Sequence, residues 1–263
     1  MTNPISSKQF AIRRQSPYHQ YIMKIPSLAA IKDTVLDILF PPLCFACEKN
    51  LLPEEKTQNV CAACFGSIAL FDTLFCSVCG ARLPGNAKIC HPEALYMLGS
   101  AASYRNEAVQ KLIWRLKYGK LRAAAVPLAG LLAQYLTTLD YHFLGFTVLP
   151  VPLHADRFEE RGFNQAELLA THVAAHLRLP LVTDVLQRVK ATPAQAKMRD
   201  RAERSANLAD AFAINPHSTA IAGKNILLVD DVFTTGATIG EAVRMLKTAG
   251  AKIVIALTIA RAI

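Results

Sequence analysis

The spacing of hydrophobic residues along the chain changes near residue 98. Before that point, residues 28–40 carry apolar side chains at helical spacing and are followed by Pro41 and Pro42, which predicts one helix. Beyond it, helical patterns alternate with short apolar runs. We expect helices over 106–118, 122–139, 164–178 and 238–249, and strands over 146–151, 181–188, 211–214, 226–229 and 252–259.

This alternation sets the fold class and the division of the chain. Strands separated by helices predict a parallel sheet with helical crossovers, and hence an α/β domain. Residues 190–207 are polar, charged and weakly patterned, which predicts a mobile loop. We divide the chain into a disordered basic tail at 1–27, a helix with a cysteine-rich module at 28–95, and the α/β domain at 96–263. Met23 is an alternative start, because the organised sequence begins there.

Two aspartates and a turn rich in threonine follow the apolar run at 226–229. Asp230 and Asp231 stand at the carboxyl end of that predicted strand, where open α/β sheets bind their ligands. The next residues lead into a helix, whose N-terminus attracts phosphate: Thr234, Thr235, Gly236, Ala237 and Thr238. Carboxylates repel phosphate but suit ribose hydroxyls or Mg²⁺. The pattern therefore predicts a ribose 5-phosphate site. The alternative, a Walker-B strand, requires a G-x-x-x-x-G-K-S/T loop that the sequence lacks.

A second turn, at 153–165, is rich in hydrogen-bond donors. It joins the end of the strand predicted at 146–151 to the start of a helix, and it contains Arg157, Arg161 and Gly162. Arginine offers several fixed donors to phosphate oxygens, which favours a phosphate-binding turn. The alternative is a solvated loop in which Arg157 pairs with a neighbouring glutamate.

All seven cysteines lie between residues 44 and 90. In a reducing compartment, this clustering indicates metal ligation rather than disulfides. The first four form two C-x-x-C pairs separated by thirteen residues, which predicts a structural zinc site of the ribbon type: Cys44, Cys47, Cys61 and Cys64.

The remaining cysteines offer three ligands for a second zinc site. They are Cys76, Cys79 and Cys90. The fourth ligand is open between Glu93, His91 and water, and a chain without a second site is the other alternative. Ligation by both Cys90 and His91 is awkward because they are adjacent.

The net charge of +9 is unevenly distributed. Residues 100–207 carry fifteen basic and nine acidic side chains, which suits a polyphosphate ligand or a nucleic acid. Residues 23–99 carry six basic and seven acidic side chains, which disfavours the cysteine module as a phosphate-binding surface. The sequence contains neither an apolar run of about 20 residues nor a signal peptide, so we expect a cytoplasmic protein without a membrane span.

Three other residues could be taken for functional ones, but the sequence pattern favours a structural or surface position for each. Trp114 lies at helical spacing with its apolar neighbours, so we expect it in the core rather than as a stacking surface. His172 and His176 are four residues apart on a predicted helix, as metal ligands can be, but we expect a surface pair.

The chain resembles the ComF family (ComFC and GntX-like proteins), in which a cysteine-rich N-terminus precedes a phosphoribosyltransferase-like domain. The string Val-Asp-Asp-Val-Phe-Thr-Thr-Gly-Ala-Thr at 229–238 is similar to the phosphoribosyl-pyrophosphate (PRPP) loop of type I phosphoribosyltransferases. The ComF resemblance covers about residues 28–263. It also rests on Leu-Pro-Val-Pro-Leu at 149–153, Arg-Gly-Phe-Asn-Gln at 161–165, Leu116-Lys117-Tyr118, Thr192-Pro193-Ala194-Gln195, and Arg204 with Asn207.

The resemblance implies a role for each part of the site. Asp230 and Asp231 would hold the ribose hydroxyls of PRPP, residues 234–238 its 5′-phosphate, and the turn at 153–162 its pyrophosphate, with Lys117 as a further candidate. The strands at 148–152 and 226–229 would lie side by side. The predicted mobile loop would cover PRPP and bring further cations to the pyrophosphate: Lys197, Arg199, Arg201 and Arg204. Magnesium would accompany PRPP, and zinc would fill the cysteine sites.

Three functions remain open at this point. The first is an enzyme that transfers phosphoribose from PRPP to an unidentified acceptor, through catalytic residues that the sequence does not identify. The second is a sensor that binds PRPP or a nucleotide without chemistry and, as the resemblance implies, acts in DNA uptake or recombination during natural transformation. The third is a single-stranded DNA-binding accessory protein, which would act with competence proteins in DNA uptake during natural transformation. The sequence leaves the oligomeric state open.

Overall fold

The computed structural model describes residues 37, 39–83, 90–190, 210–216 and 221–262. The predicted tail, most of the predicted helix at 28–40 and most of the predicted mobile loop lie outside these residues. The chain divides into two compact units, Met1–Pro41 and Pro42–Ile263. The fold described below is that of the second unit.

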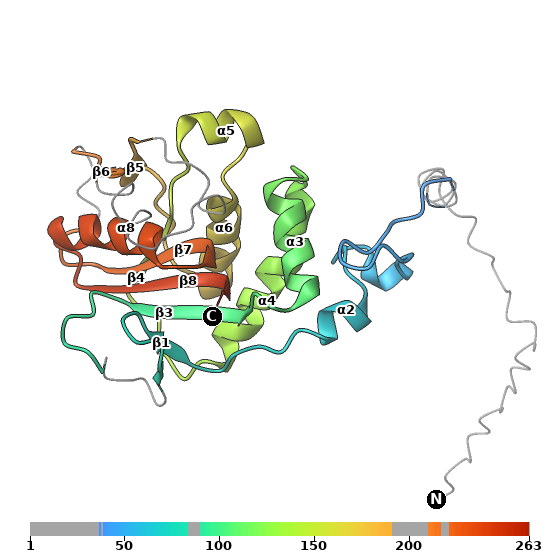
Figure 1. Cartoon of the computed structure of the whole chain (residues 1–263), viewed down its shortest axis with the longest axis horizontal. Coiled ribbons are helices and arrows are strands. Elements are labelled where there is room, and N and C mark those ends of the chain that lie inside the picture. The colour runs from blue at the N-terminus through green and yellow to red at the C-terminus, as the bar shows by residue number, and fades with distance from the viewer. Residues whose placement is uncertain (1–36, 38, 84–89, 191–209, 217–220, 263) are drawn as a thin grey trace, which may run out of the picture. The chain divides into compact units, whose positions relative to one another are not determined.

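A six-stranded sheet organises this unit, in the order β2-β1-β3-β8-β7-β4 (Figure 1). Its parallel strands are β3 (Met97–Ser103), β8 (Ile253–Arg261), β7 (Asn225–Phe233) and β4 (Phe146–Pro150). At one edge the antiparallel strands β1 (Leu74–Cys76) and β2 (Arg82–Leu83) extend it. The predicted α/β class is confirmed, and the cysteine-rich module shares its sheet with the α/β domain.

Helices pack on both faces of the sheet. The longer ones are α3 (Glu107–Lys117), α4 (Ala125–Thr138), α6 (Gln165–Leu177) and α8 (Ala237–Thr248). Four shorter elements are η1 (Pro53–Glu55), α2 (Ala62–Gly66), η2 (Arg122–Ala124) and α5 (Ala155–Arg161). Helix α6 begins as predicted, because the side chain of Asn164 caps it by accepting a hydrogen bond from the N–H of Ala166 at 3.0 Å.

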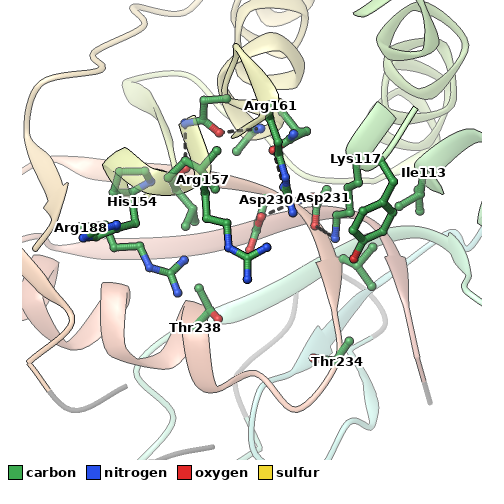
Figure 2. Close-up of a pocket in the computed structure, with 18 of the residues that line it drawn as sticks. Ile113, Lys117, His154, Arg157, Arg161, Arg188, Asp230, Asp231, Thr234 and Thr238 are labelled. Atoms are coloured by element: carbon green, nitrogen blue, oxygen red, sulfur yellow. Dashed lines mark hydrogen bonds and ion pairs between the residues drawn. The ribbon is translucent and has the colours of Figure 1, made fainter. Parts of the chain in front are cut away.

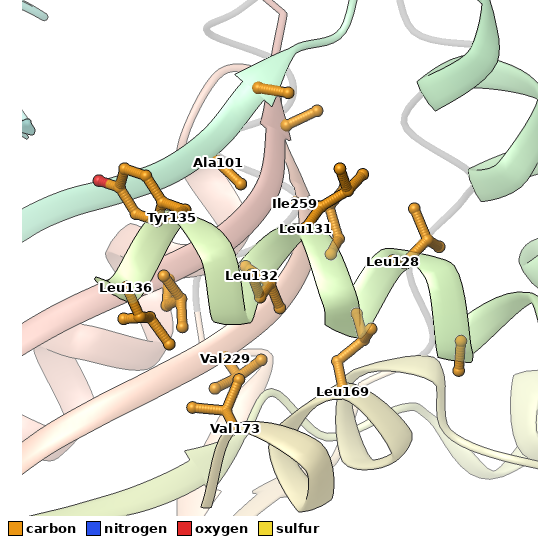
Figure 3. Packing of buried hydrophobic residues seen from close by; sticks show 14 of the residues in the cluster. Ala101, Leu128, Leu131, Leu132, Tyr135, Leu136, Leu169, Val173, Val229 and Ile259 are labelled. Carbon is orange, nitrogen blue, oxygen red and sulfur yellow. The ribbon is translucent and has the colours of Figure 1, made fainter. Parts of the chain in front are cut away.

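The apolar run of β7 serves two cores at once. Leu227 and Val229 belong to a cluster with α4 and α6, whereas Ile226 and Leu228 belong to a cluster with α8. Successive side chains of a strand point to opposite faces, so a strand covered on both sides needs an uninterrupted apolar run. Figure 3 shows Val229 among the side chains of α4 and α6.

The strand predicted at 181–188 is largely wrong. Only Leu186–Arg188 is a strand, β5, and it pairs with β6 (Phe212–Ile214) in a separate antiparallel sheet. Leu181 makes one isolated parallel bridge with Val148, after which the chain leaves the edge of the sheet. Hydrophobic spacing does not distinguish such a bridge from a continuous strand.

The described part of the chain holds no helix of the length and apolar character that crossing a lipid bilayer requires.

Candidate functional site

The two aspartates project from the carboxyl edge of the sheet. Strands β4 and β7 pair in parallel, as predicted, with Pro150 opposite Val229. Strand β4 ends there, whereas β7 continues to Phe233. Asp230 and Asp231 therefore extend beyond the end of β4, although β8 still pairs with this part of β7, and they lie at the edge where sheets of this kind bind ligands.

A cavity of about 590 Å³ lies beside these carboxylates. Side chains from α3, from the turn after β4, from β5 and from the start of α8 line it. The sequence-predicted residues among them are Lys117, Arg157, Arg161, Asp230, Asp231, Thr234, Thr235 and Thr238. The cavity lining does not include Gly162, Gly236 or Ala237. The four basic residues predicted on the mobile loop, at 197, 199, 201 and 204, lie outside the described residues.

The carboxylates are crowded, with Asp231 buried and Asp230 half-buried. Asp231 is 8% exposed, and its Oδ1 lies 2.8 Å from Lys117 Nζ. Asp230 Oδ1 accepts a hydrogen bond from the N–H of Asp231 at 2.8 Å. Burial, and then the neighbouring Asp231 carboxylate, raise the pKa of Asp230 to about 7, although Lys117 opposes the shift. A ligand that brings hydroxyl donors or a cation would relieve this repulsion.

Lys117 is held in its charged form. Burial alone disfavours the ammonium, but Asp231 outweighs burial and raises the pKa of Lys117. In Figure 2, Lys117 lies next to Asp231, while Arg157 and Arg188 lie on the other side of Asp230. The two acids thus sit between cations that come from different elements.

The turn between β7 and α8 depends on a glycine. Gly236 has a φ of +78°, and an added Cβ would lie 2.8 Å from the ring of Phe233. Gly236 provides no side-chain cap for α8, and Thr235 Oγ1 lies 3.5 Å from the N–H of Ala237. A helix start of this kind, beside threonine hydroxyls, is suited to an anion.

The turn after β4 brings two arginines to the cavity. It contains the short helix α5, which ends at Arg161 and is followed by the capping residue Gly162 with a φ of +77°. Arg161 Nη1 donates to Gln165 Oε1 at 2.9 Å, and Arg157 Nη1 lies 3.4 Å from Glu160 Oε2. The pairing of Arg157 with a neighbouring glutamate, which the alternative of a solvated loop expected, is therefore present. Exposed pairs of this kind are weak, so Arg157 can turn to an anionic ligand.

Arg188 lines the same cavity, and sequence reasoning missed it. It ends β5, and its guanidinium carbon lies 5.5 Å from the ring centre of Phe212. Burial lowers the pKa of Arg188, and Asp230 opposes that shift. The spacing of residues around 181–188 gave no sign that this side chain returns to the site.

The prediction that Trp114 is part of the core is wrong. Helix α3 buries Val109, Leu112, Ile113 and Leu116, whereas Trp114 is 58% exposed. Trp114 directly follows Ile113, so it is rotated about 100° around the helix and away from that face. It lines the cavity instead, together with Tyr118, which is 52% exposed.

Four cysteines form the first candidate metal centre. The sulfur atoms of Cys44, Cys47, Cys61 and Cys64 all lie within 4.8 Å of one another. Cys47 Sγ and Cys61 Sγ are 3.8 Å apart, close to the edge of about 3.8 Å that Zn–S bonds of about 2.3 Å give in a tetrahedron. Burial opposes ionisation of Cys44, but backbone N–H groups of Cys61, Cys47 and Ala46 lower its pKa to about 7. The donor set fits zinc.

The second candidate centre contains a histidine. Cys76, Cys79, Cys90 and His91 offer ligand atoms within 4.8 Å of one another, and Glu93 is not part of this group. His91 Nδ1 lies 3.5 Å from Cys76 Sγ and 3.2 Å from Cys90 Sγ. The expected awkwardness of adjacent ligands does not arise, because the side chains of residues 90 and 91 converge. Three thiols and an imidazole fit zinc.

The two histidines of α6 are not part of either centre. His172 and His176 are exposed, as expected for a surface pair. They are absent from the clusters of ligand atoms found among the described residues.

Comparison with known proteins assigns two parts of the chain to known domain families. A model of the double zinc ribbon domain matches residues 35–92, and a model of the phosphoribosyl transferase domain matches residues 164–263. Competence protein F of Haemophilus influenzae is 30% identical over 216 residues, which cover 79% of this chain and 91% of that protein. The chain belongs to the ComF family.

Other ComF relatives agree over a similar length. DNA utilization protein YhgH of Escherichia coli is 29% identical over 222 residues, which cover 80% of this chain and 93% of that protein. Competence protein ComFC of Bacillus subtilis is 26% identical over 212 residues, or 76% and 81% of the two chains. The match to the solved structure of TT1426 from Thermus thermophilus covers 50% of this chain and 71% of that chain. The sequence identity is 21% and the TM-score is 0.30. As a ComF protein, this chain combines a double zinc ribbon, for which zinc is structural, with a phosphoribosyltransferase domain.

Proposed function

We propose that this protein binds PRPP with magnesium and transfers its phosphoribosyl group to an acceptor. One observation carries the proposal: two aspartates lie in a single cavity between a threonine-rich helix start and a group of arginines. A ligand with a phosphate, a vicinal diol and a second polyanionic group would meet a suitable partner at each of these positions. PRPP has this order of groups.

Each part of PRPP has a proposed partner. The hydroxyls of the ribose donate to Asp230 and Asp231. The 5′-phosphate lies at the start of α8, with Thr234, Thr235 and Thr238, and Gly236 gives it room. Arg157, Arg161 and Arg188 hold the pyrophosphate, since guanidinium groups match phosphate oxygens. The carboxylates also fit Mg²⁺, which takes oxygen ligands and would neutralise charge on the pyrophosphate.

The proposed transfer replaces one bond at C1 of the ribose with another. The bond between C1 and the pyrophosphate oxygen breaks, and pyrophosphate leaves with both electrons. A lone pair of the acceptor forms the new bond to C1, and the proton of the acceptor passes to solvent or to the pyrophosphate. The three arginines stabilise the negative charge that develops on the leaving group. Lys117, which lies 2.8 Å from Asp231, can exchange that partner for a phosphate oxygen.

The names of the relatives suggest a role in the handling of DNA. One is called a competence protein and another a DNA utilization protein. We infer that this chain serves DNA uptake or use, with competence proteins as partners. A reducing compartment such as the cytoplasm would keep its cysteines available for zinc.

Binding of single-stranded DNA is a second candidate function. The excess of basic residues at 100–207 favours it. This function predicts an affinity for single-stranded DNA that falls steeply as the salt concentration is raised. A sensor or enzyme for PRPP would instead bind PRPP whether or not DNA is present.

Release of pyrophosphate separates the proposed enzyme from a sensor. Zinc-loaded protein would be incubated with PRPP, Mg²⁺ and a set of acceptors, and pyrophosphate would be measured over time. We expect acceptor-dependent release that falls at least tenfold in Arg188→Gln, but not in the exposed control Arg105→Gln. Binding of PRPP without release would identify a sensor, and the absence of binding would contradict the proposal.

A further inference from the structure

The two candidate zinc centres share one backbone arrangement. Each contains a C-x-x-C turn, which we call a knuckle, beginning at Cys44 in the first centre and at Cys76 in the second. The N–H of Glu48 donates to the carbonyl of Cys44 at 2.9 Å, and the N–H of Gly80 donates to that of Cys76 at 2.9 Å. Glu48 and Gly80 have φ values of +63° and +71°. The residue after each knuckle therefore closes an equivalent turn.

An arginine of the α/β domain contacts each knuckle in a similar way. Arg115 of α3 donates from Nε to the carbonyl of Phe45 at 2.7 Å, and its guanidinium carbon lies 5.9 Å from the centre of that ring. Arg261, the last residue of β8, has Nη1 and Nη2 3.4 Å from the carbonyl oxygen of Gly80. Its guanidinium carbon lies 4.1 Å from the ring centre of Phe75. One carbonyl and one aromatic ring thus receive an arginine at both centres.

The second of these arginines is buried. Arg261 is 6% exposed, and it takes part in none of the ion pairs found among the described residues. A buried charge is costly unless its surroundings compensate it. Three thiolates and an imidazole around Zn²⁺ leave one net negative charge next to Gly80. The loaded second centre therefore suits a guanidinium at this position.

Arg261 also connects the second knuckle to the turn before α8. Strands β8 and β7 lie side by side (Figure 1), with Arg261 opposite Phe233. The N–H of Ala262 donates to the carbonyl of Phe233 at 2.9 Å. The ring of Phe233 supports the turn, because a Cβ added at Gly236 would lie 2.8 Å from it. Phe233 and Phe75 belong to one buried cluster, so packed side chains join the knuckle to the proposed 5′-phosphate site.

A second connection runs through the chain after His91. Tyr96, five residues further on, is 8% exposed, and its hydroxyl oxygen would lie 3.3 Å from a Cβ at Gly236. The next residue, Met97, pairs with the candidate zinc ligand Cys76 across β3 and β1. Two ligands of the second centre thus adjoin residues that support the turn before α8.

We propose that the second zinc centre positions the turn before α8 through Arg261, so that zinc at this centre and a sugar phosphate in the cavity bind cooperatively. The inference rests on the function proposed above. Arg261 is a positioning residue, because it does not line the cavity. Coupling between two sites is reciprocal, so zinc raises the affinity for the sugar phosphate by the same factor as the sugar phosphate raises the affinity for zinc.

Ribose 5-phosphate with Mg²⁺ is the probe for this coupling. Free zinc would be buffered with a zinc-selective chelator, ions per chain counted by native mass spectrometry, and affinity measured by calorimetry. We expect ribose 5-phosphate to bind about 5- to 20-fold more weakly once the second ion is lost. Saturating ribose 5-phosphate should lower the free zinc needed to half-fill the second centre by the same factor. The variant His91→Ala, with the first ion alone, identifies which centre responds.

Variants of Arg261 separate positioning from a general effect on the fold. Arg261→Met keeps the length of the side chain but removes its donors and charge. With both ions bound, it should bind ribose 5-phosphate about fivefold more weakly, and ribose 5-phosphate should no longer change its zinc occupancy. Arg261→Lys, which keeps the charge and one donor group, should recover part of both effects. The exposed control Arg105→Met should behave as the wild type does.

Three results would overturn the inference. If ribose 5-phosphate binds equally well with and without the second ion, the two sites are not coupled, although the proposed function stands. If Arg261→Met weakens binding but ribose 5-phosphate leaves the zinc occupancy of the wild type unchanged, Arg261 has a structural role alone. If the folded wild type with both ions does not bind ribose 5-phosphate, the proposed function fails and this inference fails with it.

Discussion

The half-buried carboxylate of Asp230 should make the ligand-free protein less stable as the pH rises. Burial and Asp231 raise its pKa from the ordinary value of 3.8 to about 7. The folded protein therefore binds this proton more tightly than the unfolded chain does, and ionisation favours unfolding. The cost is absent below about pH 4, grows up to about pH 7 and then stays constant. Asp230→Asn removes the ionisation and should stabilise the fold increasingly between about pH 4 and pH 7, and by a constant amount above pH 7.

The expected gain follows from the size of the shift. One pKa unit corresponds to about 1.4 kcal/mol, so the full shift sets a ceiling of about 4 kcal/mol. Asp230 borders a cavity that water enters, so we expect about half of this: ~2 kcal/mol at pH 8.5 and ~1 kcal/mol at pH 5.5. For a chain of this size, 2 kcal/mol corresponds to a rise in Tm of roughly 4–8 °C.

Urea unfolding of zinc-saturated, ligand-free protein would measure this difference at the two pH values. The wild type would be compared with Asp230→Asn and with Asp140→Asn, a change at an exposed position. We expect the control to alter the free energy of unfolding by no more than about 0.5 kcal/mol. An Asp230→Asn variant that is no more stable than the wild type, or whose advantage does not grow with pH, would refute the reasoning.

Two further predictions concern single residues outside the aspartate pair. His91→Ala should lower the zinc content, measured by native mass spectrometry, from two ions per chain to about one. Glu93→Ala should leave two ions per chain. If Glu93→Ala loses an ion and His91→Ala does not, the fourth ligand is Glu93 instead. Gly236→Ala places a Cβ against the ring of Phe233 at a positive φ, so it should destabilise the fold by about 1–2 kcal/mol in urea unfolding and weaken ribose 5-phosphate binding. An unchanged midpoint with unchanged binding would show that the turn does not need glycine.

The parts that could be predicted from the sequence are those in which local pattern and fold agree. The apolar run of β7, the two aspartates and the threonine-rich turn are adjacent in the chain, so their order alone indicates a strand, a ligand edge and a helix start. Most predicted helices of the α/β domain agree with the structure within one or two residues, except that the one expected at 122–139 begins as η2 before α4.

Strand β3 shows where local pattern is insufficient. Its sequence Met-Leu-Gly-Ser-Ala-Ala-Ser is rich in small residues that strands disfavour, so no strand was predicted there. The structure gives the reason for the small residues. A Cβ at Gly99 would lie 3.2 Å from Leu257 and 3.4 Å from the buried ring of Tyr135, so helix α4 packs closely over this strand. The need for a small residue at position 99 thus comes from a tertiary contact, which the local sequence pattern does not reveal.

The candidate site divides in the same way. Asp230, Asp231 and the turn arginines belong to dense local motifs and could be found by reading along the chain. Arg188 and Trp114 reach the cavity because β5 and α3 pack beside it, and hydrophobic spacing does not encode that placement. The structure is therefore needed to find site residues such as Arg188 and Trp114, whose place depends on tertiary packing.

Calorimetric titration of PRPP with Mg²⁺ into the zinc-loaded protein tests the central claim most directly. The wild type would be compared with the double variant Asp230→Asn, Asp231→Asn and with Asp140→Asn. We predict saturable binding by the wild type and by the control, and at least a tenfold loss of affinity in the double variant. A folded wild type that does not bind PRPP, or a double variant that binds it as well as the wild type, would contradict the account.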